Sequence, residues 1–205
     1  MTYLKSKKSN SLFFILFLIL SACQSDKTET STATTPSVDV NKIKLFDLVS
    51  EETSKVAFIN QITEDQEVNF YNYDAMYQGS GVCIGDINND GLSDIYFGGN
   101  QVANKLYLNK GNMQFEDITD KAGVGDSQGW TTGVSMADVN GDGNLDIYVC
   151  RFLYNNANQL RNLLYINQGN GTFVESAQQY GVADAGFSIQ ASFFDYDKDN
   201  NLDLY

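Results

Sequence analysis

The sequence predicts an all-β protein, a partial β-propeller built from four-stranded antiparallel blades. Two features lead to this expectation. An acidic turn of eleven residues occurs three times, beginning at Asp86, Asp138 and Asp195, at spacings of 52 and 57 residues. Short runs of alternating apolar and polar residues flank the copies, and such runs are typical of strands. A repeat of this length has room for four short strands, which is the content of one propeller blade.

The strands are expected in the same order in each repeat. One strand leads into the acidic turn and a second leaves it, so the turn closes a β-hairpin. A third strand runs into an Asn/Gly turn, and a fourth precedes the crossing to the next repeat. We expect them at residues 81–84, 94–98, 105–111 and 115–118, then at 133–136, 146–150, 163–169 and 173–176, and then at 189–193.

Each acidic turn carries oxygen-bearing side chains at its positions 1, 3, 5 and 9, and Gly or Asn at position 6. A residue that tolerates positive φ at position 6 lets the chain curl, so that the side chains converge. The carboxylates would then repel one another, and a hard divalent cation with oxygen ligands removes this repulsion. Calcium accepts a mixed shell of carboxylates, amides and carbonyls more readily than magnesium does. The sequence therefore predicts three calcium sites.

Each predicted site has four side-chain ligands and the backbone carbonyl of position 7. The side-chain ligands are Asp86, Asn88, Asp90 and Asp94, then Asp138, Asn140, Asp142 and Asp146, then Asp195, Asp197, Asp199 and Asp203. The carbonyls belong to Leu92, Asn144 and Asn201. An EF-hand is excluded because its position 12 is Glu, whereas the first two turns have Phe97 and Val149 there. Acidic turns that bind no metal remain the alternative.

The composition excludes several function classes. The chain has no His, so it has neither a Ser-His-Asp nor a Cys-His mechanism, and no imidazole ligand for zinc or haem. Its formal net charge of −13 repels phosphate backbones, so we expect no nucleic-acid partner. A hydrophobic content of 42% is too high for a disordered acidic chain, so part of the sequence should bury a core.

The N-terminal region has the order of a bacterial lipoprotein signal. Three lysines within the first eight residues precede an apolar run at residues 12–20, and Ser21 and Ala22 then lead to Cys23. Nine apolar residues are too few to span a bilayer as a helix. The segment resembles a lipobox, which implies a lipid on Cys23 that anchors the chain to the membrane of the bacterial cell envelope, at the outer membrane or cell surface. An ordinary secretory signal is the alternative.

The acidic turn followed by Asn-Lys-Leu-Tyr-Leu-Asn at residues 104–109 resembles the FG-GAP or VCBS repeat of integrin α-chain-type propellers. The order of anchor, polar tether and Gly-Ser-Gly-Val-Cys-Ile-Gly-Asp at residues 79–86 is similar to bacterial lipoproteins of the cartilage acidic protein group. That group carries further repeats and a C-terminal ASPIC/UnbV domain. The resemblance covers roughly residues 43–205. It differs in having two complete repeats and a third that stops at Tyr205, so we expect an N-terminal fragment of a longer protein. Asn200 stands at position 6 of the third turn, where the pattern has Gly.

The expected organisation is set by these segments. It consists of a signal peptide at 1–22, a lipid-anchored flexible tether at 23–42, a lead-in segment at 43–78, blades at 79–128 and 129–185, and an incomplete blade at 186–205. We expect a calcium-stabilised binding or adhesion module for an extracellular protein or glycan, without a catalytic constellation. The alternatives are the non-catalytic part of a polysaccharide-acting enzyme whose active site lies in further sequence, and an architectural spacer of a surface complex.

Other candidate residues have plainer interpretations. Trp130 and Phe187 each lie eight residues before an acidic turn, and we expect core aromatics that bridge blades rather than a sugar-stacking face. Cys83 and Cys150 lie in different predicted blades, which favours two buried free thiols over a disulfide. The acids of the lead-in segment are expected to form a solvated face; they are Glu51, Glu52, Glu64, Asp65 and Glu67.

Overall fold

The structure is a computed structural model that describes residues 44, 46–73, 75–152 and 161–205. The expected signal peptide, the tether and Cys23 lie outside the described residues. The chain divides into the units Met1–Leu45 and Phe46–Tyr205, and the helices and strands named below belong to the second unit. No helix among the described residues is long and apolar enough to cross a membrane.

The second unit consists of antiparallel sheets, as predicted. The first sheet has the order β1-β2-β3-β4, the second β5-β6-β7-β8, and β9 and β10 form a two-stranded sheet. The strands are β1 (Val82–Gly85), β2 (Asp94–Phe97), β3 (Lys105–Asn109), β4 (Phe115–Asp117), β5 (Trp130–Ala137), β6 (Asp146–Phe152), β7 (Leu163–Asn167), β8 (Phe173–Glu175), β9 (Phe193–Phe194) and β10 (Asp203–Leu204). Two one-turn helices accompany them, α1 (Glu51–Ser54) and α2 (Thr119–Ala122). The all-β fold of stacked four-stranded blades is confirmed.

The strand predicted at residues 189–193 is shorter than expected, because β9 comprises only Phe193–Phe194. The residues before it bind the neighbouring sheet through their carbonyl groups. Thr132 Oγ1 donates to the carbonyl of Ser188 at 2.7 Å, and Ser135 Oγ donates to the carbonyl of Ala191 at 2.6 Å. These carbonyls are therefore satisfied by β5 side chains instead of a strand ladder.

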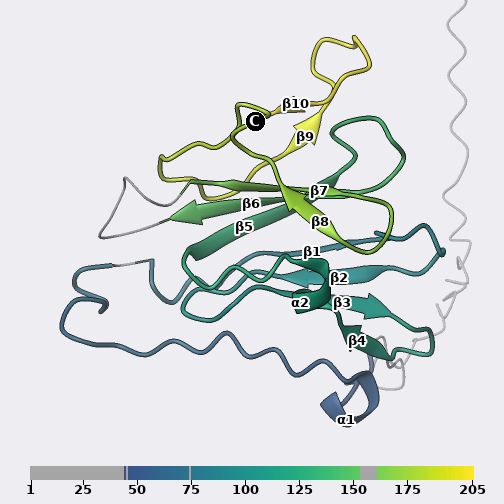
Figure 1. Cartoon of the computed structure of the whole chain (residues 1–205). Coiled ribbons are helices and arrows are strands. Elements are labelled where there is room, and N and C mark those ends of the chain that lie inside the picture. The colour runs from purple at the N-terminus through teal and green to yellow at the C-terminus, as the bar shows by residue number, and fades with distance from the viewer. Residues whose placement is uncertain (1–43, 45, 74, 153–160) are drawn as a thin grey trace, which may run out of the picture. The chain divides into compact units, whose positions relative to one another are not determined.

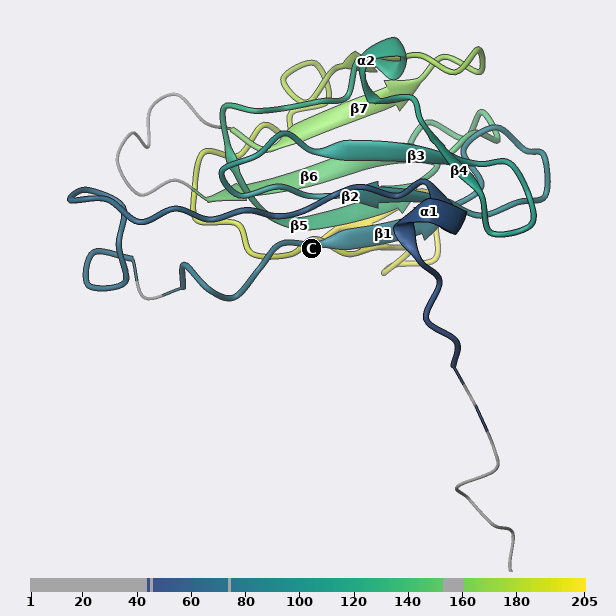
Figure 2. The ribbon, with the colours of Figure 1, turned by 90° about the horizontal axis from the view of Figure 1, so that it is seen from below.

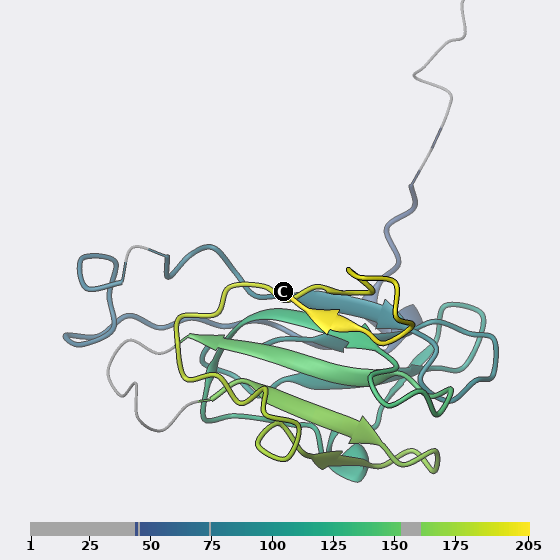
Figure 3. The same ribbon diagram turned by 90° about the horizontal axis from the view of Figure 1, so that it is seen from above.

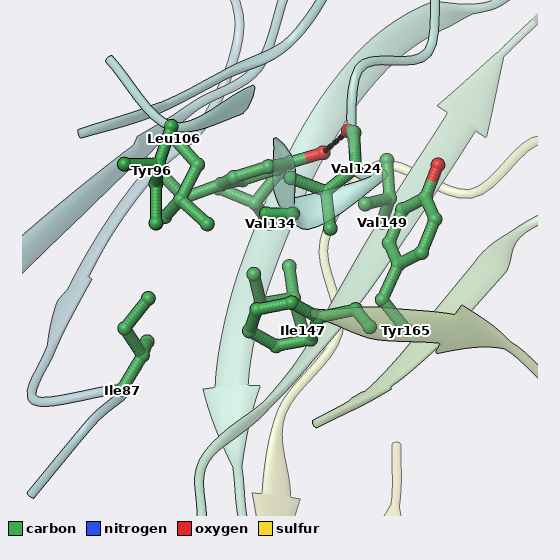
Figure 4. Packing of buried hydrophobic residues seen from close by; sticks show 11 residues of the cluster. Ile87, Tyr96, Leu106, Val124, Val134, Ile147, Val149 and Tyr165 are labelled. Atoms are coloured by element: carbon green, nitrogen blue, oxygen red, sulfur yellow. Dashed lines mark hydrogen bonds between the residues drawn. The ribbon is translucent and has the colours of Figure 1, made fainter. Parts of the chain in front are cut away.

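The first two sheets pack face to face, and Figure 1 shows them as successive layers with the β9–β10 pair beyond. Tyr96 and Leu106 from the first sheet and Val134, Ile147 and Val149 from the second are buried together in one apolar cluster (Figure 4). Burying each such side chain contributes about 1.5–3 kcal/mol. Neither sheet buries this face alone, so stacking holds the unit together.

The same polar contact closes the core in both repeats. The buried Tyr96 donates its hydroxyl hydrogen to the carbonyl of Val124 at 2.8 Å, and Tyr148 donates to the carbonyl of Val182 at 2.8 Å. These bonds fix the segment after the fourth strand of each sheet against its second strand. The sequence repeat is therefore also a structural repeat.

The β9–β10 pair packs on the far face of the second sheet (Figure 3). Phe193 and Leu204 contact the buried cluster that contains Tyr148, Cys150 and Ile166. The second sheet is consequently covered on both faces.

The lead-in segment runs across the first sheet on the face that the second sheet leaves open (Figure 2). The Phe58 ring stacks on Phe97 with centroids 5.0 Å apart. Asn60 and Asn100 exchange hydrogen bonds of 2.6 and 2.9 Å. Its acidic residues are exposed, as predicted for a solvated face. The segment thus covers part of the blade, a role that its sequence does not reveal.

Glycine allows the close approach of the first strands of adjacent sheets. A Cβ built on Gly81 would lie 2.7 Å from the Val134 backbone nitrogen and 2.9 Å from the Gly133 Cα. Because both neighbours are backbone atoms, relief requires the sheets to separate.

Gly81→Ala is therefore expected to lower the free energy of unfolding by about 1–3 kcal/mol through overpacking. Denaturant unfolding followed by circular dichroism measures this. Val82→Ala is the matched control because Val82 is exposed, and it should change stability by less than about 0.5 kcal/mol. Equal stability of Gly81→Ala and the unsubstituted chain would show that the two sheets do not pack this closely.

Candidate metal centre

The three acidic turns are the loops that join the first two strands of each sheet. They connect β1 to β2, β5 to β6 and β9 to β10. The register pairs Gly85 with Asp94 and Ala137 with Asp146, so position 9 lies directly across from the residue before the turn. The predicted ligands therefore lie on hairpin loops, as expected.

Each loop is held by its own first aspartate, which accepts backbone hydrogen bonds from the other side of the turn. In the first loop Asp86 accepts from the N–H groups of Asp90 and Gly91, at 3.1 and 2.8 Å. Asp138 and Asp195 make the same pair of bonds to positions 5 and 6 of their loops. Positions 1 and 5 are thereby drawn together in all three copies.

Position 6 has positive φ in every loop, as predicted. The values are 84° for Gly91, 85° for Gly143 and 70° for Asn200. The Asn at this position of the third loop adopts the same conformation as the glycines, which is consistent with the tolerance of Asn for the left-handed region.

Position 4 also has positive φ, which the sequence analysis missed. The residues are Asn89 at 58°, Gly141 at 73° and Lys198 at 65°. Because the three differ in type and Lys has no preference for this region, no sequence pattern indicated it.

The aspartate at position 9 is buried in the first two loops and fixes the loop to the sheet. Asp94 accepts hydrogen bonds from the N–H groups of Ile87 at 3.0 Å and Asn109 at 2.7 Å. Asp146 accepts from Val139 at 3.0 Å and Asn167 at 2.8 Å. Burial raises the pKa of both carboxyl groups. The backbone hydrogen bonds lower this pKa, whereas the carboxylates at positions 5 and 1 of the same loop raise it.

Asn109 and Asn167 are site residues that the sequence analysis missed. They are the last residues of the third strands β3 and β7, 15 and 21 residues after the aspartates to which their N–H groups bind. The Asn109 side chain also donates to the carbonyl of Ser93, at position 8 of the first loop. The repeated Asn at the end of each third strand was the available signal, but the sequence alone assigned it only to a turn.

Hydrogen bonds lower the pKa of the exposed aspartate at position 5 in the second and third loops. A backbone hydrogen bond from Asn144, followed by one from the Asn140 side chain, lowers the pKa of Asp142. The Asn201 side chain and backbone do the same for the pKa of Asp199. The second and third loops therefore each present an ionised carboxylate at this exposed position.

The third loop brings most carboxylates together. Asp195, Asp197 and Asp203 each offer an oxygen within 4.8 Å of the others, among the residues that the structure describes. The first two loops have Asn88 and Asn140 at position 3, so they offer one carboxylate fewer.

The donor set fits a hard cation such as calcium. All predicted side-chain donors are oxygen atoms, and a carboxylate oxygen that accepts one N–H keeps a second lone pair. The N–H groups of Leu92, Asn144 and Asn201 each donate to the position 5 carboxylate at 2.8 Å, which holds position 7, the residue with the predicted carbonyl ligand, beside that carboxylate. The loops therefore hold the predicted ligands in one repeated arrangement.

The two aromatic candidates have different environments. Trp130 is buried, and its ring meets Tyr73 edge to face with centroids 4.9 Å apart, as expected for a core aromatic. Phe187 is 69% exposed, so its expected core position is wrong. Its ring contacts Phe152, 4.9 Å away, which in turn stacks on Tyr73. We call Tyr73, Trp130, Phe152 and Phe187 the aromatic end.

Cys83 and Cys150 are free thiols, as expected. Burial raises the pKa of the Cys83 thiol to about 12 and that of Cys150 to about 11. Both are therefore protonated and unreactive at neutral pH, which indicates a packing role.

The FG-GAP-like repeat model matches residues 86–149 and 152–205. Its first match begins at Asp86, the first residue of the first acidic loop. The chain belongs to the FG-GAP-like repeat family. The resemblance inferred from the sequence is thus confirmed.

The chain is also similar to cartilage acidic protein 1 of several vertebrates. Cartilage acidic protein 1 of Xenopus tropicalis is 28% identical over 166 residues, which is 80% of this chain and 24% of that protein. Cartilage acidic protein 1 of Mus musculus is 41% identical and that of Homo sapiens 39% identical over 69 residues, 34% of this chain. These segments are 11% and 10% of the two relatives. The chain therefore spans a quarter or less of the relatives it matches.

Asp146→Asn tests whether position 9 fixes an FG-GAP loop to its sheet. An amide replaces one acceptor oxygen with a donor, which leaves a backbone N–H at this buried position without an acceptor. We expect a loss of about 1–3 kcal/mol in the free energy of unfolding, measured by denaturant titration in EDTA. Asp120→Asn, at an exposed aspartate of α2, should change it by less than about 0.5 kcal/mol. A loss no greater than that of the control would remove this role from Asp146.

Proposed function

We propose that the chain is a membrane-tethered, calcium-stabilised β-propeller module that binds a protein or glycan outside the cytoplasm. Lipid on Cys23 attaches it to the bacterial envelope, and residues 23–42 act as a tether. The observation that carries the calcium part is the repetition of one hydrogen-bonded loop conformation in three successive hairpins, together with the three carboxylates of the third loop that lie within 4.8 Å of one another.

Calcium acts structurally in this proposal. The carboxylates at positions 1, 5 and 9 of each loop repel one another, and Asp90 and Asp86 both add to the raised pKa of the buried Asp94. A bound cation reverses this repulsion and favours the ionised form. The ion therefore stabilises the hairpins at the end of each sheet, while the described chain takes no catalytic role.

The aromatic end supports the binding part of the proposal. Trp130 pairs with Phe152 at one end of the β5–β6 ladder, and Ala137 pairs with Asp146 at the other end, beside the acidic loop. The aromatic end therefore lies away from the acidic loop. Its exposed Phe187 ring rests on Phe152, which keeps the ring in place without burying it. Aromatic faces held in this way suit stacking on sugars and packing on protein side chains.

Calcium should raise the thermal stability of the full chain. Extracellular calcium sites have dissociation constants near 10⁻⁴–10⁻³ M, so tenfold saturation contributes about 1.4 kcal/mol per site. Three sites would raise the melting temperature by about 10 °C between EDTA and 5–10 mM calcium, as measured by scanning calorimetry. Magnesium at the same concentration should give a much smaller increase. An identical melting temperature with calcium and in EDTA would contradict the structural role of calcium.

Binding is tested on glycan and protein arrays with the full chain in calcium. Phe187→Ala should weaken binding by about tenfold or more, because it removes the exposed ring of the aromatic end. Tyr180→Ala is the control, since Tyr180 is also an exposed aromatic residue but lies on the turn after β8.

Other outcomes would select other functions. Turnover of a polysaccharide by a longer form of the protein would favour the non-catalytic part of an enzyme. Absence of both binding and turnover would favour an architectural spacer. Release of the chain from membranes in Cys23→Ser checks the lipid anchor, and equal membrane retention of that variant would contradict it.

A further inference from the structure

A side chain of the first acidic loop binds directly to the second loop. The Asn89 amide nitrogen donates to the carbonyl of Gly143 and to Asn144 Oδ1, both at 3.1 Å. Asn89 stands at position 4 of its loop, between two predicted ligands. Gly143 and Asn144 stand at positions 6 and 7 of the second loop.

The contact continues to the predicted ligands of the second loop. The side-chain amide of Asn144 donates to Asp142 Oδ1 at 3.0 Å, and its backbone N–H donates to the same oxygen at 2.8 Å. The N–H of Gly143 donates to Asp138 at 2.8 Å. Asn89 is therefore connected to the carboxylate at position 1 through Gly143 and to the carboxylate at position 5 through Asn144. A displacement of Asn89 is transmitted to both carboxylates through one intervening residue.

A second, buried bridge joins the same two loops. The side-chain amide of Asn167 donates to the carbonyl of Ile87 at 2.8 Å and to that of Leu145 at 3.1 Å. Ile87 is position 2 of the first loop, and Leu145 is position 8 of the second. The N–H of Asn167 also holds the carboxylate of Asp146. One buried residue thus fixes the backbone beside predicted ligands of both loops.

The second and third loops differ in this respect. Position 4 of the second loop is Gly141, which has no side chain to donate, and no hydrogen bond joins these two loops among the described residues. Within the described part of the chain, hydrogen bonds therefore connect the first pair of loops and not the second.

We infer that the first two loops bind calcium cooperatively through the Asn89 and Asn167 bridges, while the third loop binds independently. This inference rests on the proposed calcium binding. Ordering one loop by an ion fixes the peptides to which the bridges attach, so less ordering remains for the second ion. Asn89 and Asn167 act as positioning residues, since neither is a ligand.

Calorimetric calcium titration of the full chain tests this by a thermodynamic cycle. All variants carry Asp195→Asn, which disables the third loop. Asp138→Asn and Asp86→Asn then give the binding constants of the first and second loops alone. The product of the two constants measured with both loops active, divided by the product of the separate constants, is the coupling factor. We expect a factor of about five.

Asn89→Gly removes one bridge with little disturbance, because Asn89 is exposed, has positive φ, and corresponds to the glycine of the second loop. The coupling factor should fall to about two, since the Asn167 bridge remains. Lys198→Gly is the matched control at position 4 of the third loop, where φ is also positive, and it should leave the factor at five.

Hydrogen exchange gives an independent readout. With the first loop disabled by Asp86→Asn, calcium in the second loop should slow amide exchange at residues 88–91, and Asn89→Gly should weaken this effect, since only the Asn167 bridge remains. A coupling factor of one with both loops binding calcium would overturn the inference while the proposed function stands. Absence of calcium binding in every variant would overturn both.

Discussion

Each acidic hairpin holds several carboxylates within one short loop, and their mutual repulsion has to be offset for the hairpin to persist. The first two loops supply part of this compensation themselves, because the first aspartate accepts two backbone N–H groups and the buried aspartate at position 9 accepts two more. The remaining charge faces solvent at position 5. A divalent cation at that point would complete the compensation, and the proposed function depends on it.

The loops and the sheets depend on each other. Stacking of the first two sheets buries Tyr96, Leu106 and Ile147, and it also places the first loop against the second. Asn167 belongs to the second sheet but holds the backbone of the first loop. Any ion that orders the loops would therefore also oppose separation of the blades, which explains how sites at one end of the sheets can stabilise the whole unit.

Local patterns predicted most of the fold. The period-2 runs and the repeated turn sufficed for the four strands of each blade, and glycine or asparagine at position 6 predicted the positive φ of Gly91, Gly143 and Asn200. Features set by distant residues were not predictable. The carbonyls of Ser188 and Ala191 bind hydroxyl groups of β5, 56 residues away in sequence, and β9 begins only at Phe193. Phe187 remains exposed while it contacts Phe152, whose ring also stacks on Tyr73 of the lead-in segment.

The candidate site likewise combines features that the sequence predicts with features that depend on packing. The ligand pattern was readable because every donor lies within one turn, whereas Asn109, Asn167 and the loop-to-loop contact of Asn89 depend on how strands and blades pack. A crystal structure of the protein grown with calcium, with an anomalous difference map, tests the central claim most directly. The account predicts one calcium peak in each of the three loops, about 2.3–2.6 Å from the oxygens of positions 1, 3, 5, 7 and 9. Well-ordered loops without any peak would contradict it.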